Sequence, residues 1–139
     1  MLFRSNMRKK IFTIFASLLI ASLTLSSCSG EGNAAISNVD AQTFLAQAQS
    51  SAIKIIDVRS AGEFASGHLA GALNIDVESG GFDSGIANLD KTATYGLYCR
   101  SGRRSSVAAK RMAEAGFTNI INFNKGGFED LAALGAPTE

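Results

Sequence analysis

Histidine, cysteine and tryptophan are scarce in this chain of 139 residues, which contains one histidine, two cysteines and no tryptophan. A zinc site in a protein draws about three or four ligands from cysteine, histidine and carboxylate side chains. One histidine and, as argued below, one available cysteine do not meet that need. We therefore predict that the protein binds no metal ion and uses no other cofactor.

Acidic residues are absent from one part of the chain, residues 1–27. There the 15-residue apolar run "IFTIFASLLIASLTL" (11–25) follows four basic residues, Arg4, Arg8, Lys9 and Lys10. The run is shorter than the roughly 20 apolar residues of a membrane-spanning helix, and it lacks the polar positions that give a core helix its solvent face. Together these features are typical of a secretory signal peptide. We predict one at residues 1–27, with translation starting at Met1 or Met7.

The next residues resemble the lipobox of bacterial lipoproteins. In "LTLSSCSG", Leu25 and two serines precede Cys28. By this resemblance the signal peptide is removed and Cys28 becomes a lipidated N-terminus, followed by a small, polar tether up to residue 35. Several acyl chains anchor a protein firmly, whereas one does so only marginally. We therefore expect an exported domain that is lipid-anchored to a bacterial membrane and faces the periplasm or the cell exterior.

Removal of the leader changes the net charge of the protein. Four of the 13 Lys and Arg residues lie in the leader, so nine remain against all 12 acidic residues and the net charge falls from +1 to −3. This weakly acidic remainder has no basic stripe, which argues against binding to nucleic acid. The three arginines within residues 100–104 are a local exception to the acidic background.

Apolar, strand-like runs alternate with helical patterns after residue 35. We predict strands at 53–58, 72–75, 92–99 and 118–123, helices at 41–49, 105–116 and 128–134, and single helical turns after Ser60 and within 78–89. Asp40 or Ser37 is expected to cap the first helix. The buried face of the second helix is predicted to contain Val107, Ala108, Met112 and Ala115. Strands separated by helices form a parallel sheet, whose ligands lie at the carboxyl ends of the strands.

The stretch "YCRSGRRSSVAAKRM" (98–112) places Cys99 at the end of a strand, with the following helix beginning near Ser105. A glycine in the short loop between them lets backbone N–H groups approach an anion, and a helix N-terminus favours negative charge. Such surroundings lower the pKa of a cysteine thiol from about 8.5 to between about 3.5 and 7.5. We predict a reactive thiolate at Cys99. The alternative is an inert, buried cysteine whose neighbouring arginines point into solvent.

Two stretches resemble the rhodanese family, "IIDVRSAGEFASGHLAGALNI" (55–75) and "YGLYCRSGRRSSVAAKRMAEAGFTNIINFNKGG" (95–127). They contain the family's Asp-Val-Arg, Glu-Phe and Gly-His steps, its Tyr-Cys, its Ser-Gly-x-Arg-Ser loop and its final Gly-Gly, in order. The resemblance runs from residue 36 to residue 134. It implies one α/β domain, residues 36–139, with a five-stranded, mainly parallel sheet flanked by helices. Family members often carry a tryptophan shortly after the Gly-Gly, and here Leu131 or Phe128 takes that place.

The resemblance implies a sulfurtransferase. Cys99 matches the nucleophile that takes a sulfane sulfur from thiosulfate or a persulfide donor and passes it, as a persulfide, to cyanide or a thiol acceptor. The loop that binds the sulfur-containing anion matches Arg100, Ser101, Gly102, Arg103 and Arg104. For Arg100 and Arg103 an orientation toward solvent remains open.

Five further residues match supporting positions of the family. Asp57 matches an acid that braces neighbouring loops, and Arg59 and Glu63 are spaced to pair across a turn. Ser105 is expected to cap the helix after the loop. His68 could activate a thiol as a base. In the family, however, this position belongs to a loop after a short helix, and a thiol that is already ionised needs no base.

Three other interpretations differ in testable ways. A Cys-x5-Arg phosphatase or arsenate reductase would have an arginine at position 105, which is Ser105, whereas Arg104 ends a Cys-x4-Arg loop. A lipid-tethered module could carry sulfur or bind a partner without catalysis, although inactive relatives typically lose the cysteine that this chain keeps. A Cys28–Cys99 disulfide could form in an exported protein, but lipidation of Cys28 would prevent it.

Overall fold

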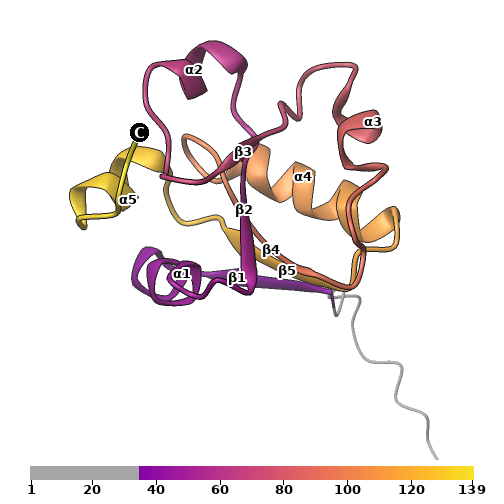
Figure 1. Cartoon of the computed structure of the whole chain (residues 1–139), viewed down its shortest axis with the longest axis horizontal. Helices are drawn as coiled ribbons and strands as arrows, with labels where there is room; N and C mark the ends of the chain where they lie inside the picture. The colour runs from indigo at the N-terminus through magenta and orange to yellow at the C-terminus, as the bar shows by residue number, and fades with distance from the viewer. Residues whose placement is uncertain (1–34) are drawn as a thin grey trace, which may run out of the picture.

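The structure of the chain is a computed structural model that describes residues 35–139 (Figure 1). The predicted signal peptide, Cys28 and all but the last residue of the predicted tether lie outside these residues. Within residues 35–139, none of the helices has both the length and the apolar character needed to cross a membrane.

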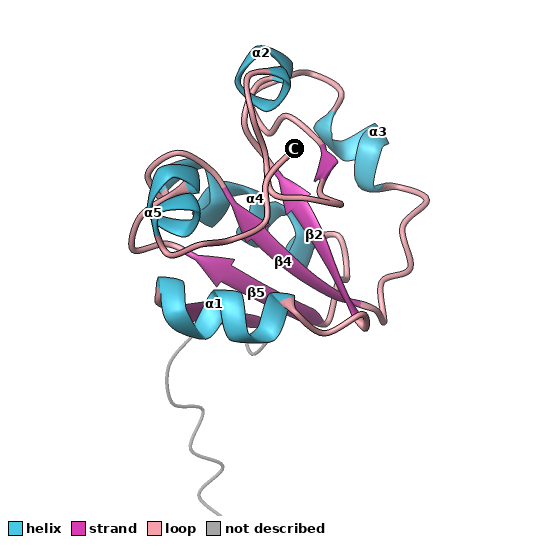
Figure 2. Cartoon of the chain, turned by 60° about the vertical axis from the view of Figure 1, so that its left-hand side comes forward, coloured by secondary structure: helices cyan, strands magenta, loops and turns pink. Residues whose placement is uncertain are grey.

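Five parallel strands form one sheet in the spatial order β1-β5-β4-β2-β3 (Figure 2). The strands are β1 (Ile36–Val39), β2 (Ile53–Asp57), β3 (Leu73–Asn74), β4 (Thr94–Tyr98) and β5 (Asn119–Phe123). The helices are α1 (Ala41–Ala48), α2 (Ala61–Ala65), α3 (Phe82–Ile86), α4 (Arg103–Glu114) and α5 (Phe128–Ala133). The predicted α/β domain with a five-stranded parallel sheet flanked by helices is confirmed.

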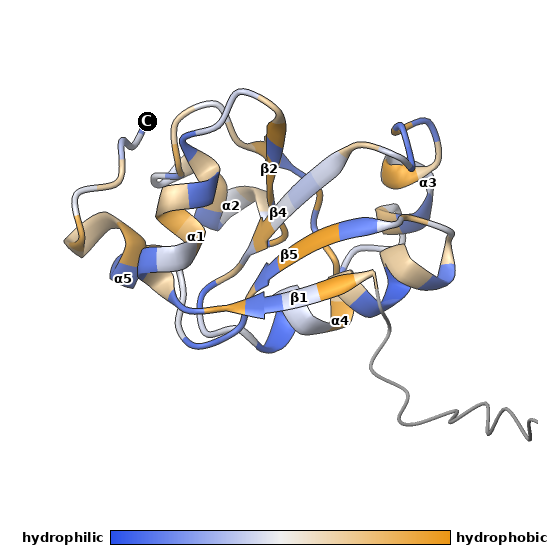
Figure 3. Ribbon diagram, turned by 90° about the horizontal axis from the view of Figure 1, so that it is seen from below, coloured by the Kyte–Doolittle hydropathy of each residue, from blue (hydrophilic) through white to orange (hydrophobic). Residues whose placement is uncertain are grey.

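A separate hydrophobic core lies on each face of the sheet. Residues of α3 and α4 pack on one face, and residues of α1 and α5 pack on the other. Strand β5 accordingly lies between α1 and α4 (Figure 3). Side chains alternate along β4, so Tyr95, Leu97 and Cys99 join the core under α4, whereas Tyr98 joins the core under α1 and α5. The alternation therefore fixes which core receives the cysteine.

The first helix and the first strand show what local sequence pattern can and cannot predict. Asp40 caps α1, because its side chain accepts a hydrogen bond from the Thr43 N–H at 2.8 Å. Strand β1 was not among the strands predicted from pattern. Its four residues, Ile-Ser-Asn-Val, contain only two apolar side chains, and it becomes a strand by pairing with β5, with Ile36 opposite Ile120.

Helix α4 differs from its prediction in its start and in its buried face. It begins at Arg103, two residues earlier than expected, because Gly102 at φ 88° turns the chain from the loop into the helix. Val107, which was predicted to face the core, is 46% exposed, whereas the next two residues, Ala108 and Ala109, are fully buried. Met112 is also buried, as predicted, and Ala115 is exposed, so the prediction is right at the centre of the face and wrong at its two ends.

The parallel sheet brings three loops to one edge. Strand β2 ends at Asp57, β4 ends just before Cys99, and β5 ends just before Asn124. Because all five strands run in the same direction, these three ends lie together at the carboxyl edge of the sheet. The cysteine loop is therefore flanked on both sides by polypeptide from neighbouring strands.

Candidate active site

The Cys99 sulfur is held inside the turn that joins β4 to α4. Cys99 is buried and its thiol is free. Gly102 adopts a left-handed conformation, and its N–H donates a hydrogen bond to the Cys99 Sγ at 3.0 Å. A side chain at Gly102 would collide with the Asn124 carbonyl oxygen. The loop therefore needs glycine at this position for both its backbone conformation and its packing.

Hydrogen bonds to the sulfur decide the acidity of the Cys99 thiol. Burial of the thiol raises its pKa, but donors around the sulfur outweigh burial, and the pKa is lowered overall. These donors are the backbone N–H groups of Ser105, Ser101 and Gly102 and the Ser105 hydroxyl. The hydroxyl has a single proton and also lies 3.0 Å from the Phe123 carbonyl oxygen, so the backbone amides are the dependable donors.

Ser105 does not cap α4, contrary to prediction. The N-cap is Gly102, which has no side-chain oxygen, and Ser105 is the third residue of the helix. Its buried hydroxyl lies 3.0 Å from the Phe123 carbonyl oxygen and 3.2 Å from the Gly102 carbonyl oxygen, so these two acceptors share its one proton. Ser105 therefore ties the first turn of α4 to the end of β5, while the free amides of that turn remain available to the sulfur.

The loop after β5 packs closely against the cysteine loop. The Phe128 N–H donates a hydrogen bond to the Cys99 carbonyl oxygen at 2.9 Å. Any side chain at Gly127 would overlap the backbone of Arg100. Glycine is therefore needed here to let two backbones approach each other. This contact explains the second glycine of the Gly-Gly pair that follows the last strand.

Asp57 is the buried centre of a polar cluster beneath the site. Its carboxylate accepts hydrogen bonds from the Arg59 backbone and guanidinium groups at 2.7–3.0 Å and from the Tyr98 hydroxyl at 2.7 Å. Arg59 also donates to the Gly67 carbonyl oxygen at 2.7 Å, and its guanidinium lies 4.4 Å from the centre of the Phe128 ring. Asp57 thus connects the loops after β2, before β3 and at the start of α5.

The predicted Arg59–Glu63 pair does not form. Arg59 turns inward to Asp57, and Glu63 instead binds Arg104, whose guanidinium donates to both carboxylate oxygens at 2.7 and 2.8 Å. Glu63 also completes a capping box with Ser60 at the start of α2. The hydrogen bonds from Arg104 are the largest cause that lowers the pKa of Glu63, to about 2. The same bonds, and further the charge of Cys99, raise the pKa of Arg104.

The other two arginines of the loop face outward. Arg103 has 72% of its side chain exposed and pairs with Glu78 at 2.9 Å, and Glu78 also approaches Arg104 at 3.7 Å. Arg100 is exposed and forms no ion pair within residues 35–139. Of the three arginines, Arg104 is therefore the one fixed near the sulfur, and Arg100 is the one without a carboxylate partner among the described residues.

The His68 ring makes structural contacts and not a contact with the Cys99 sulfur. Its Nδ1 is 2.9 Å from the Phe64 carbonyl oxygen, and its ring stacks on the Phe64 ring. Its backbone pairs with Glu139 through two hydrogen bonds of 2.9 Å. These contacts hold the C-terminal segment against the loop after α2. Among residues 35–139, no three His, Cys, Asp or Glu side chains lie close enough together to hold a metal ion.

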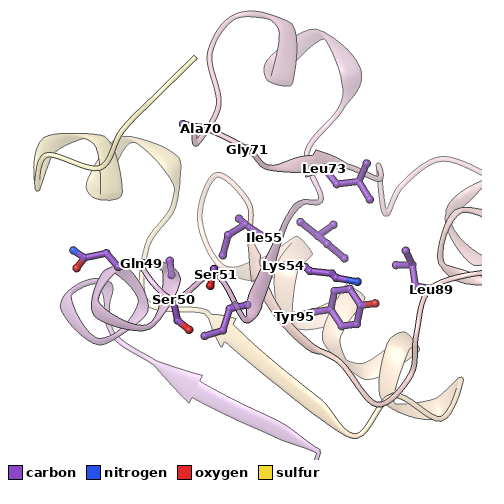
Figure 4. Close-up of a pocket in the computed structure, with 13 residues that line it drawn as sticks. Gln49, Ser50, Ser51, Lys54, Ile55, Ala70, Gly71, Leu73, Leu89 and Tyr95 are labelled. Atoms are coloured by element: carbon purple, nitrogen blue, oxygen red, sulfur yellow. The ribbon is translucent and has the colours of Figure 1, made fainter.

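Two cavities differ in size and in their distance from the cysteine loop along the fold. The larger, of about 430 Å³, lies along β2 and is lined by residues such as Lys54, Leu73 and Tyr95, and it does not include the cysteine loop (Figure 4). A smaller cavity of about 290 Å³ lies against the cysteine loop and is lined by Arg59, Glu63, Ser66, Gly67, Arg100, Phe128 and Glu129, but not by Cys99 itself. Phe128, and not the buried Leu131, therefore forms the wall expected from the missing tryptophan.

Sequence reasoning missed Tyr98 and Glu78. Tyr98 precedes the cysteine and connects it to Asp57, and the Tyr98 hydroxyl also accepts a hydrogen bond from the Leu69 N–H at 3.0 Å. Tyr98 is part of the Tyr-Cys motif, but the motif does not indicate that its hydroxyl binds Asp57. Nothing in the local sequence around Glu78 indicates that it meets the cysteine loop, because the contact joins residues 25 positions apart.

We expect the Cys99 thiolate to form at a lower pH in the folded chain than in the unfolded chain. The pKa of Cys99 is lowered in the fold, whereas a free cysteine titrates near about 8.5. The measurement is the ultraviolet absorbance of the thiolate during a pH titration, taken as the difference between the parent and Cys99→Ser. The same difference in urea is the control. A folded midpoint at or above the urea midpoint would contradict the assignment.

The Glu63–Arg104 pair should make stability depend on pH. Because the pKa of Glu63 falls from 4.5 to about 2 on folding, the ionised pair stabilises the fold above pH 4.5 and this contribution is lost as the pH falls toward 2. Glu63→Gln should therefore lower the free energy of unfolding at pH 7 by about 1–2 kcal/mol, since solvent screens a partly exposed pair. Chemical denaturation at pH 7 and pH 3 measures this. An equal loss at both pH values would show that the charge is not involved.

Comparison with known proteins agrees with the geometry. Residues 40–134 match the model of the rhodanese-like domain. The chain is 35% identical over 77 residues to the thiosulfate sulfurtransferase PspE of Escherichia coli, covering 55% of this chain and 72% of that protein. It is 30% identical over 80 residues to the thiosulfate sulfurtransferase GlpE of Shewanella oneidensis, covering 58% and 76%.

Solved structures give the same result. The solution structure of the rhodanese-like domain from the Anabaena sp. Alr3790 protein superposes with a TM-score of 0.66 at 27% identity, covering 73% of this chain and 77% of that one. The family motif, the parallel sheet and the cysteine loop thus coincide in one stretch of the chain. From its sequence and its fold, this chain belongs to the rhodanese family.

Proposed function

We propose that the protein is a sulfurtransferase that carries a sulfane sulfur on Cys99. The observation that carries the proposal is the Cys99 sulfur itself, which accepts a hydrogen bond from the Gly102 amide at 3.0 Å and has a lowered pKa. A thiolate of this kind is a nucleophile near neutral pH. The two relatives above are thiosulfate sulfurtransferases by name, which supports thiosulfate as a donor.

The reaction has two steps. In the first, the Cys99 thiolate attacks the outer sulfur of thiosulfate and forms a new S–S bond. The old S–S bond breaks and its electron pair leaves with sulfite, so Cys99 becomes a persulfide. In the second step an acceptor, cyanide or a thiol, attacks the outer sulfur, and the electron pair of the Cys99 S–S bond returns to Sγ. The loop amides stabilise the anion on Cys99 before and after both steps.

The arginines have different roles in this proposal. Arg104 supplies positive charge near the sulfur and is kept in place by Glu63. Cys99 has no exposed surface in the present arrangement, so neighbouring side chains must move when the donor enters. Arg100 has no ion pair within residues 35–139 and Arg103 has only an exposed pair with Glu78, so both can move, and their guanidinium groups suit an anionic donor.

The assay is formation of thiocyanate from thiosulfate and cyanide by the purified full chain. We expect the parent to form thiocyanate and Cys99→Ser to form none, because Cys99 is the one cysteine of residues 35–139 and its sulfur is the nucleophile of the proposed reaction. Cys28→Ser is the matched control and should keep its activity. A phosphate ester is tested in parallel. Phosphate release without thiocyanate would favour the phosphatase alternative, and folded parent with neither activity would favour a module that binds a partner.

We propose from the sequence that the protein is exported and lipid-anchored through Cys28. The support is the basic start, the apolar run and the lipobox-like residues before the cysteine. In bacteria grown with labelled palmitate, the parent should carry the label and fractionate with membranes, whereas Cys28→Ser should do neither. Label that persists in Cys28→Ser would rule out this anchor.

A further inference from the structure

The small cavity adjoins the loop of the proposed sulfur-transfer site, although the buried Cys99 does not line it. Arg100, which lines it, follows the cysteine directly, and Phe128, which also lines it, donates its N–H to the Cys99 carbonyl oxygen at 2.9 Å. Its volume of about 290 Å³ is near the lower limit of about 300 Å³ for pockets that hold small organic ligands. It is therefore larger than an inorganic anion requires.

The charged groups of this cavity divide into paired and unpaired ones. Arg59 is held by Asp57 and the Gly67 carbonyl oxygen, and Glu63 is held by Arg104. Arg100 and Glu129 also line the cavity, and neither forms an ion pair with any other residue of 35–139. Both are exposed. The cavity thus presents one available cation and one available carboxylate that do not neutralise each other.

The remaining wall of the cavity is apolar. The Phe128 ring is half-buried, and the Arg59 guanidinium covers it at 4.4 Å from the ring centre. Because Arg59 is itself fixed by Asp57, the orientation of the ring is fixed as well. A short carbon chain can pack against such a ring while charged groups on it reach the two available side chains.

We propose that this cavity binds the sulfur acceptor, and that the acceptor is a small zwitterionic thiol of the amino-acid type. Its carboxylate binds Arg100, its ammonium group binds Glu129, and its carbon chain lies against Phe128. The pairing of both charged groups, which such a thiol carries on one carbon, selects it over a thiol that carries a single charge. This inference rests on the proposed sulfurtransferase function and names the class of its acceptor.

The transfer is balanced without a further reactant. The acceptor sulfur attacks the outer sulfur of the Cys99 persulfide and forms a new S–S bond. The bond between that outer sulfur and the Cys99 Sγ breaks, and its electron pair stays on Sγ, which returns to the thiolate held by the loop amides. The proton of the acceptor thiol moves to the transferred sulfur. The products are a small persulfide and the original enzyme.

The test uses four thiols that carry both charges, one or none: L-cysteine, cysteamine, 3-mercaptopropionate and 2-mercaptoethanol. The full chain is first loaded with sulfur from thiosulfate, and loss of the Cys99 persulfide is followed in a single turnover by mass spectrometry. Each thiol is compared between parent and variant, which cancels its intrinsic reactivity. The variants are Arg100→Gln and Glu129→Gln. The controls are Lys110→Gln and Glu114→Gln, exposed residues of α4 that do not line the cavity.

Arg100→Gln should slow L-cysteine and 3-mercaptopropionate by about three- to fivefold, as expected for the loss of one exposed ion pair, and should not slow the other two thiols. Glu129→Gln should slow L-cysteine and cysteamine by a similar factor and should not slow 3-mercaptopropionate. Both effects should fade at high salt, which screens exposed charges. The two control variants should leave all four rates unchanged.

Two results would overturn the inference in different ways. If each variant changes all four rates equally, or changes none, the cavity does not select its acceptor by charge, while the sulfurtransferase function stands because the persulfide has formed and been discharged. If the parent forms no persulfide from thiosulfate, the proposed function fails and the acceptor site fails with it.

Discussion

The burial of one ionisable sulfur is the constraint on which the rest of this structure depends. A buried anion is costly unless hydrogen bonds replace the water it has lost. Cys99 is fully buried, and the amides of its own turn supply those bonds, with Gly102 at 3.0 Å. That geometry requires a strand that ends at the sulfur, a left-handed glycine and a helix that begins at once. The β4–α4 turn supplies all three.

Two carboxylates hold this turn from outside. Asp57 binds the Tyr98 hydroxyl next to the cysteine, and Glu63 binds Arg104 at the start of α4. Asp57 is the last residue of β2 and Glu63 lies in α2, the helix that follows, so one neighbouring segment contacts the cysteine loop at two points. Arg59 extends the same cluster to Phe128. The wall of the cavity and the environment of the sulfur are therefore parts of one connected structure. Substitution of Asp57 or Glu63 should alter both the shape of the cavity and the acidity of the Cys99 thiol.

The sequence predicted the residues of the site better than it predicted their partners. The glycine in the loop, the strand ending at Cys99 and the parallel sheet follow from local pattern and from a short motif, and each was placed correctly. Strand β1 did not, because a short edge strand takes its conformation from pairing with β5. The partner of Glu63 could not be predicted from local pattern either, because the sequence offers both Arg59 and Arg104 as candidates. Only the fold, which brings residues 41 positions apart together, decides between them.

We propose that Cys99, held as a thiolate by its loop, receives a sulfur atom. The most direct measurement is the intact mass of the folded chain after exposure to thiosulfate and removal of the excess, followed by peptide mapping. We expect a gain of one sulfur atom, located on Cys99, reversed by cyanide and absent from Cys99→Ser. A folded chain with a free Cys99 thiol that gains no sulfur, or that gains it elsewhere, would show that Cys99 is not the sulfur carrier.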